Sequence, residues 1–139
     1  MDWKTCAVDD LRRYNLVKMG ISNSEDKLRT MEDAVTNARH SFEKKTKRLD
    51  SQLVDAIVET ERLKTNIRIA QSLITLVDRG LSALSDDERY VLEKLYMSDC
   101  PRSTRALLER LGYSQRSLYR VRDRALRKFT LAMYGVEIT

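Results

Sequence analysis

Apolar residues recur at seven-residue spacing through the first part of the chain. One series contains Tyr14, Ile21, Leu28, Val35 and Phe42, and its companion contains Val17, Ser24, Met31 and Ala38. Such spacing is typical of a helix that buries one stripe against another helix, and its phase is kept across Gly20. We therefore expect one helix from about residue 4 to about residue 40. A break at Gly20 is the alternative, because glycine ends many helices and Ser22-x-x-Glu25 has the form of a capping box.

A second pair of heptad series predicts a helix from about residue 47 to about residue 79, with Arg79-Gly80 as its C-terminal signal. One series contains Leu49, Ala56, Leu63, Ala70, Val77 and Leu84, and the other contains Leu53, Thr60, Ile67, Ile74 and Leu81. The polar stretch 40–50 between the two helices predicts a turn. Residues 1–82 are thus expected to form a long antiparallel helical hairpin of coiled-coil type.

The partner of the hairpin's apolar stripe is left open by the sequence, because a heptad seam does not fix the number of helices that share it. The stripe could close the hairpin, or dock the C-terminal part of the chain. It could also join copies of the chain, and we expect a homo-oligomer, a dimer or tetramer, through these N-terminal helices.

From residue 83 the hydrophobic pattern changes to three short helices. Ser85 and Glu88 form a capping box for a helix over residues 86–97, and a second helix covers 103–111. Gly112 ends that helix, and Ser114 caps a third helix from 115 to about 130. The apolar residues expected to face the core are Val91, Leu92, Leu95, Tyr96, Ala106, Leu107, Leu111, Leu118, Val121, Ala125, Leu126 and Phe129. A short helix, a turn with glycine and a Ser-capped helix are typical of a helix-turn-helix domain, here residues 83–139.

Composition agrees with an all-α fold, since the 139 residues include only four Gly and one Pro. The formal net charge is +5, and residues 101–128 hold nine Lys or Arg against Glu109 and Asp123. The positive charge is therefore concentrated in the expected helix-turn-helix. Such a concentration favours an anionic partner, and for this motif the partner is double-stranded DNA.

The first two turns of the third helix carry the side chains that could read bases. A recognition helix enters the major groove with its N-terminal end, and Gln and Arg make bidentate hydrogen bonds to adenine and guanine. The base-reading candidates are Gln115, Arg116, Tyr119 and Arg120. Candidates for contacts to the DNA backbone, which fix register without reading sequence, are Arg102, Ser103, Arg105, Ser114, Ser117, Arg122, Arg124 and Lys128.

The last third of the chain resembles the promoter-reading domain of bacterial sigma factors, called region 4. The resemblance lies in "LSDDERYVLEKLYM" and in "LGYSQRSLYRVRDRALRKF". The whole chain looks similar to phage late-gene transcription regulators of the ArpU and RinA kind, in which an L-R-x-Y motif, here Leu11-Arg12-Arg13-Tyr14, begins an N-terminal helical region. The resemblance implies a phage or prophage regulator that activates late or packaging genes by binding promoter DNA. It leaves contact with RNA polymerase open, and it implies the same four base-reading positions.

Other functions have little support in the sequence. His40 is the only histidine, and no catalytic, cofactor-binding or metal-ligand spacing is present, so we expect no enzyme. Cys6 and Cys100 are expected to be reduced thiols of a cytoplasmic protein, because we find no secretion signal or membrane span. Two alternatives remain: a DNA-packaging protein of the small-terminase type, and a helical interaction protein that does not bind DNA.

Overall fold

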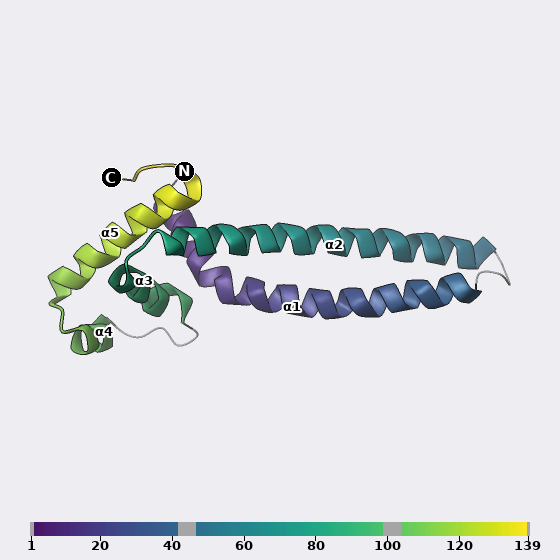
Figure 1. The fold of residues 1–139 in the computed structure, drawn as a ribbon, viewed down its shortest axis with the longest axis horizontal. Helices are drawn as coiled ribbons and strands as arrows, with labels where there is room; N and C mark the ends of the chain where they lie inside the picture. The colour runs from purple at the N-terminus through teal and green to yellow at the C-terminus, as the bar shows by residue number, and fades with distance from the viewer. Residues whose placement is uncertain (1, 42–46, 99–103, 139) are drawn as a thin grey trace. The chain divides into compact units, whose positions relative to one another are not determined.

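The computed structural model describes residues 2–41, 47–98 and 104–138, and the side chains among them outside 41–50. The helices are α1 (Trp3–Ser41), α2 (Lys47–Ser82), α3 (Asp86–Leu92), the π-helical turn η2 (Glu93–Met97), α4 (Thr104–Leu111) and α5 (Gln115–Tyr134) (Figure 1). Within these ranges no residue is in a strand. The prediction of an all-α chain is confirmed.

Helix α1 continues through Gly20 without interruption. Gly20 is exposed, and a Cβ atom added there would meet no atom within 4 Å, so neither packing nor backbone conformation requires glycine at this position. The prediction of one helix over about residues 4–40 is confirmed, and the alternative of a break at Gly20 is wrong. The local cap signals are overridden because the apolar stripe continues in phase on both sides of them.

Helix α2 extends past Gly80 to Ser82, so the prediction that Arg79-Gly80 ends the helix is wrong. A Cβ atom at Gly80 would lie 2.7 Å from Cε2 of Phe129 and 3.1 Å from Cγ of Met133. Glycine is therefore needed here for the close approach of α5 to α2. A glycine that ends a helix and a glycine that allows close helix contact cannot be distinguished from sequence alone.

The described residues divide into two compact units, which we describe separately. Unit 1 contains Met1–Leu16 and Leu73–Thr139, and unit 2 contains Val17–Ser72. The border between these units does not coincide with the expected division at residue 82. Residues from both ends of the predicted hairpin segment belong to unit 1, together with the C-terminal helices.

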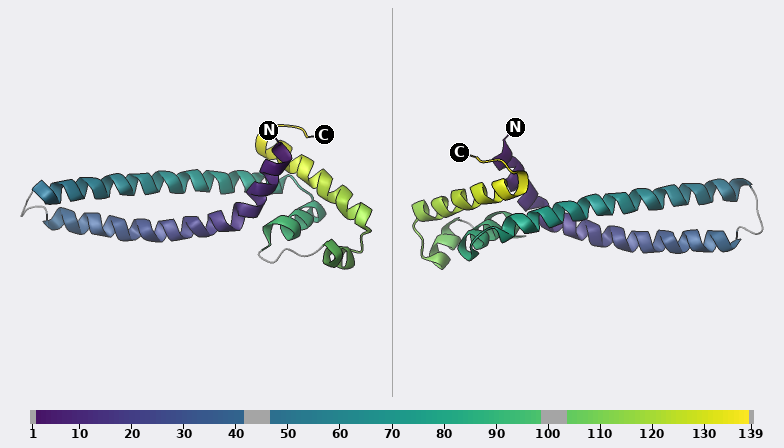
Figure 2. Two further views of the ribbon diagram at one scale, coloured as in Figure 1. Left: turned by 180° about the vertical axis from the view of Figure 1, so that it is seen from behind. Right: turned by 45° about the horizontal axis from the view of Figure 1, so that its top comes forward.

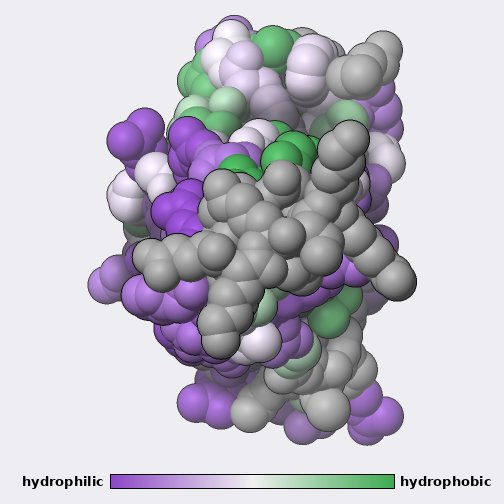
Figure 3. Space-filling model, turned by 90° about the vertical axis from the view of Figure 1, so that its right-hand side faces the viewer, coloured by the Kyte–Doolittle hydropathy of each residue, from purple (hydrophilic) through white to green (hydrophobic). Residues whose placement is uncertain are grey.

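Unit 2 is a pair of helical segments from α1 and α2 that run in opposite directions side by side in the views of Figures 1 and 2. Lys64 forms an ion pair of 3.5 Å with Glu32, and Gln71 donates a hydrogen bond of 3.3 Å to Glu25. The buried side chains described in this unit are Val35, Thr60 and Ile67. The core formed by the side chains that the structure describes here is therefore thin. In Figure 3 hydrophilic surface predominates, and hydrophobic surface shows in separate places.

Unit 1 has a core to which α1, α2, α3 and α5 all contribute. The first cluster of buried residues consists of Ala7, Leu11, Val77, Leu81, Leu92, Ala125, Leu126 and Phe129. A second cluster joins α3, α4 and α5 through Val91, Leu107, Leu118 and Val121. The first turns of α1 are thus a structural part of the unit that contains α4 and α5.

Polar contacts reinforce the attachment of α1 within unit 1. The ring of Trp3 lies 5.0 Å from that of Tyr134, and the Tyr134 hydroxyl donates a hydrogen bond to the buried carboxylate of Asp10. The Tyr14 hydroxyl donates a hydrogen bond of 2.6 Å to Asp78. Burial, together with this bond, raises the pKa of Tyr14 to about 12. The Leu11-to-Tyr14 motif therefore has packing roles in this unit.

Candidate nucleic-acid interface

The connection between α4 and α5 depends on one glycine and one serine. Gly112 follows α4 with φ of 68°, a left-handed conformation that other residues adopt only with strain, and its N–H donates to the Leu108 carbonyl at 3.0 Å. Ser114 then has an extended backbone, and its hydroxyl accepts a hydrogen bond of 3.1 Å from the Ser117 N–H. Both residues have the roles predicted from the sequence, and together they begin α5 one short turn after α4.

One face of α5 is fixed by burial. Leu118 and Val121 pack against α3 and α4, while Ala125, Leu126 and Phe129 pack into the core that α1 and α2 share. All five were predicted to face inward. Because these residues occupy one side of the helix, the side chains on the opposite side of its first turns are left exposed.

The four predicted base-reading residues lie together on that exposed side. All of Gln115, Arg116, Tyr119 and Arg120 are exposed, and they line one shallow depression together with Asp123. In the part of the chain that the structure describes, neither Arg116 nor Arg120 has an ion pair or side-chain hydrogen bond. Both guanidinium groups are therefore available to a ligand without breaking an internal contact.

Tyr119 is held in place by its neighbours on α5. Gln115 donates a hydrogen bond of 2.9 Å from Nε2 to the Tyr119 hydroxyl, and Cζ of Arg122 lies 4.7 Å from the centre of the tyrosine ring. An exposed cation–π contact of this kind contributes about 0.5–1 kcal/mol. Tyr119 is thus presented in one orientation in the depression.

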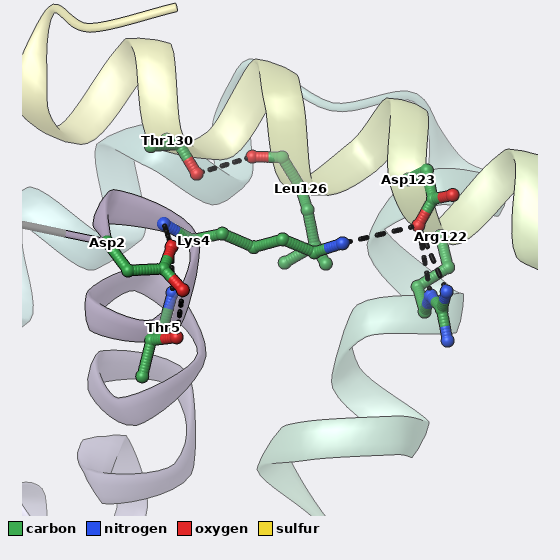
Figure 4. Close-up of polar contacts among 7 residues, drawn as sticks. All are labelled: Asp2, Lys4, Thr5, Arg122, Asp123, Leu126 and Thr130. Carbon is green, nitrogen blue, oxygen red and sulfur yellow. Dashed lines mark hydrogen bonds and ion pairs between the residues drawn. The ribbon is translucent and has the colours of Figure 1, made fainter. Parts of the chain in front are cut away.

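Arg122, predicted to contact the DNA backbone, instead binds a carboxylate within unit 1. Its Nε and Nη2 atoms donate hydrogen bonds of 3.2 and 3.1 Å to Oδ1 of Asp123. Nζ of Lys4, from the first turn of α1, lies 3.7 Å from the same oxygen (Figure 4). Asp123 therefore compensates part of the positive charge that Arg122 would offer to a phosphate.

Arg124 and Lys128, also predicted backbone contacts, bind a buried carboxylate that the sequence does not reveal as their partner. Nε of Arg124 donates to Oε2 of Glu88 at 3.1 Å, and Nζ of Lys128 donates to Oε1 at 2.9 Å. The Glu88 side chain is only 1% exposed, whereas those of Arg124 and Lys128 are 57% and 50% exposed. Both cations thus fasten α5 to α3, and each still has surface that a phosphate could reach.

The carboxylate of Glu88 is also part of the predicted capping box of α3. It accepts a hydrogen bond of 3.0 Å from the Ser85 N–H, and the Ser85 hydroxyl accepts from the Glu88 N–H. Burial raises the pKa of Glu88, but the Ser85 N–H and the cations Lys128 and Arg124 outweigh this effect and lower it to about 2. The capping-box pattern identifies Glu88 locally, but no sequence signal connects it with residues that follow 36 and 40 positions later.

The other residues predicted to contact the DNA backbone differ in their exposure and in their partners. The Ser114 hydroxyl caps α5 and donates a hydrogen bond of 3.0 Å to the Ser117 hydroxyl, so both groups already have partners. The Arg105 side chain is 89% exposed and lies 3.6 Å from Glu109. Arg102 and Ser103 lie outside the described residues.

No protein-family model, curated protein or solved structure matches the chain. In the described ranges, none of the helices has the length and apolar character needed to span a membrane.

Proposed function

We propose that the protein is a sequence-specific DNA-binding transcription regulator. In this proposal α4 and α5 form a helix-turn-helix of the sigma region 4 type, and α5 is the recognition helix. The main support for this proposal is the exposed side of α5, where one depression is lined by Gln115, Arg116, Tyr119 and Arg120. Residues with these hydrogen-bonding groups, on the first turns of a capped helix, suit the edges of base pairs in the major groove.

Electrostatics supports the same partner. The nine Lys and Arg of residues 101–128 far outnumber the two acidic residues there, and the rest of the chain is slightly acidic. A duplex carries one negative charge per about 1.7 Å of its axis, so this segment would bind it more tightly than other parts of the chain. Binding would weaken steeply as salt rises, because each neutralised phosphate releases counterions.

The biological role in the proposal comes from the sequence resemblance. A chain similar to late-gene regulators of phages and prophages would activate late or packaging genes at their promoters, in the bacterial cytoplasm. Direct contact with RNA polymerase is left open by this proposal.

Unit 2 is proposed to join copies of the chain into a dimer or tetramer. Its core is thin, and it exposes several large apolar side chains for which a second pair of helices would provide cover. These are Met19, Val54, Val58 and Ile69, with exposed fractions of 61%, 58%, 49% and 65%. A DNA-binding dimer would recognise two half-sites, each contacted by one α5.

The test is selection of bound fragments from random duplex DNA by the full chain, followed by titration of the best site at several salt concentrations. Arg120→Ala should weaken binding to the selected site by about 10- to 100-fold and change the preference at one or two base pairs. The control is Arg68→Ala, which removes the same charge from an exposed position on α2 and should leave the preference unchanged. If Arg120→Ala weakened binding to all duplexes equally, Arg120 would not read bases.

Mass in solution separates the regulator from the alternatives. A dimer or tetramer supports it, whereas a ring of eight or more subunits would favour a packaging protein of the small-terminase type. If the protein showed no salt-dependent binding to duplex DNA, the remaining alternative would be a helical interaction protein that does not bind DNA.

A further inference from the structure

Asp123 is an acidic residue in a surface that we propose to bind DNA. It lines the depression on α5 with two arginines, a glutamine and a tyrosine, and it is the single carboxylate among those lining residues. Its side chain is 41% exposed. A carboxylate at this place opposes non-specific attraction to phosphates, so its presence requires a more specific explanation.

The two oxygens of Asp123 have different surroundings. Oδ1 accepts the hydrogen bonds from Nε and Nη2 of Arg122, and the ammonium group of Lys4 lies 3.7 Å from the same atom. Oδ2 accepts no hydrogen bond from any described residue. The carboxylate is thus oriented through one oxygen, and the other is an acceptor open to a ligand.

The cations beside Oδ1 reduce the cost of bringing this carboxylate close to DNA. Opposite charges at such distances screen the negative charge that the phosphates would otherwise repel. Lys4 supplies one of these charges from α1, outside the helix-turn-helix itself. The first turn of α1 therefore contributes to the electrostatics of the proposed interface.

Asp123 lies on the same side of α5 as the proposed base-reading residues. Arg116, Tyr119, Arg120 and Asp123 have the spacing i, i+3, i+4, i+7, which places them on one side of a helix. The same spacing is used by recognition helices that read several successive bases from the major groove. Asp123 lies one turn beyond Arg120, so both could reach neighbouring base pairs.

The chemistry of a carboxylate selects one base. An ionised Asp only accepts hydrogen bonds, and the major-groove edges of guanine and thymine present acceptors. Adenine presents an amino donor beside the N7 acceptor, which repels a carboxylate, whereas cytosine presents its N4 amino group without a neighbouring acceptor of its own. Cytosine is therefore the best match for Oδ2.

We propose that Asp123 is a specificity-determining residue of the DNA interface and that its Oδ2 accepts a hydrogen bond from the N4 amino group of a cytosine. The inference rests on the proposed DNA-binding function, and it adds one base preference to it. The sequence alone did not indicate this role, because there Asp123 is only one of two acidic residues in a basic segment.

The test compares base preferences of full-length variants on duplexes that differ from the selected site at one base pair at a time. The wild-type protein should prefer cytosine at one position by about 5- to 150-fold. Asp123→Ala should reduce that preference to less than about threefold and keep the preferences at other positions. Asp123→Asn should move the preference at this position towards adenine, since an amide can donate to N7 as well as accept from N6.

Two controls separate base reading from charge and from positioning. Glu109→Gln removes one negative charge from α4, outside the depression, and should strengthen binding to all duplexes without changing any preference. Arg122→Ala removes one partner of Oδ1 and leaves Lys4 beside that oxygen, so it should reduce the preference for cytosine less than Asp123→Ala does. Circular dichroism of each variant should match that of the wild-type protein.

The outcomes distinguish this inference from the function on which it rests. If Asp123→Ala keeps the preference for cytosine, or if Arg122→Ala abolishes that preference equally, Asp123 does not read the base and only the inference fails. If the wild-type protein binds no duplex in a salt-dependent manner, the proposed function fails and the inference fails with it.

Discussion

Replacing Glu88 by Gln is expected to destabilise unit 1 strongly at neutral pH. The substitution keeps the size of the side chain and its ability to accept from the Ser85 N–H, but it removes the charge that Arg124 and Lys128 bind. In the folded chain the pKa of Glu88 is lowered from 4.5 to about 2. Since one pKa unit corresponds to about 1.4 kcal/mol, the ionised form contributes about 3 kcal/mol to the free energy of unfolding.

The dependence on pH follows from the sign of this shift. A group whose pKa is lower in the folded state stabilises it above the unfolded pKa, and this contribution disappears as pH falls through the folded pKa. The difference in free energy of unfolding between wild-type protein and Glu88→Gln should therefore be about 2–3 kcal/mol at pH 7 and should shrink between about pH 5 and pH 2.

Trp3 provides the measurement, because it is the only tryptophan and its ring lies against Tyr134 in unit 1. Urea titrations followed by its fluorescence at several pH values give the free energies. Glu93→Gln is the matched control, since Glu93 forms an exposed ion pair of 2.8 Å with Arg89 and should lose no more than about 0.5 kcal/mol. Equal stability of Glu88→Gln and wild type at pH 7 would refute the reasoning.

Three further substitutions and one truncation have defined outcomes. Gly80→Ala should lose about 1–3 kcal/mol in the same urea titration, because its methyl group would clash with Phe129, whereas Gly20→Ala should stabilise the helix by up to about 1 kcal/mol, as monitored by circular dichroism. Gly112→Ala should cost about 1–2 kcal/mol, because its left-handed backbone strains a residue with a Cβ atom; an unchanged urea midpoint would contradict this. A fragment of residues 83–139 should lack cooperative thermal unfolding, because α1 and α2 supply part of its core; a sharp transition would argue against a shared core.

The local features of the fold follow from local signals. The heptad series predicted both long helices to within a few residues, because an amphipathic stripe repeats over many turns and outweighs a single glycine. Ser114 and Gly112 were predicted with equal accuracy, since caps and left-handed turns depend on adjacent residues. The exposure of Arg116 and Arg120 followed from the inward positions of α5.

The long-range features could not be predicted in this way. Leu11 shares a core with Phe129, and Glu88 binds Lys128, but each pair is far apart in sequence and either partner would suit many alternatives. The expected division at residue 82 followed a change in periodicity, whereas the compact units follow packing. The orientation of Asp123 depends on Lys4 and Arg122 together, which no single segment reveals.

The two separate segments of unit 1 impose an order on folding. Asp10 and its partner Tyr134 are 124 residues apart in the sequence, so the contacts between the start of α1 and α5 cannot form until α5 has been synthesised. Unit 2 lies between the two segments in sequence, and both of its helical segments are synthesised before α3. If the two helical segments of unit 2 pair first on the ribosome, their pairing brings the two segments of unit 1 close together. The later contacts within unit 1 then close a shorter effective loop, at a lower entropic cost. A segment proposed to join copies of the chain would thus also act as an early folding element for unit 1.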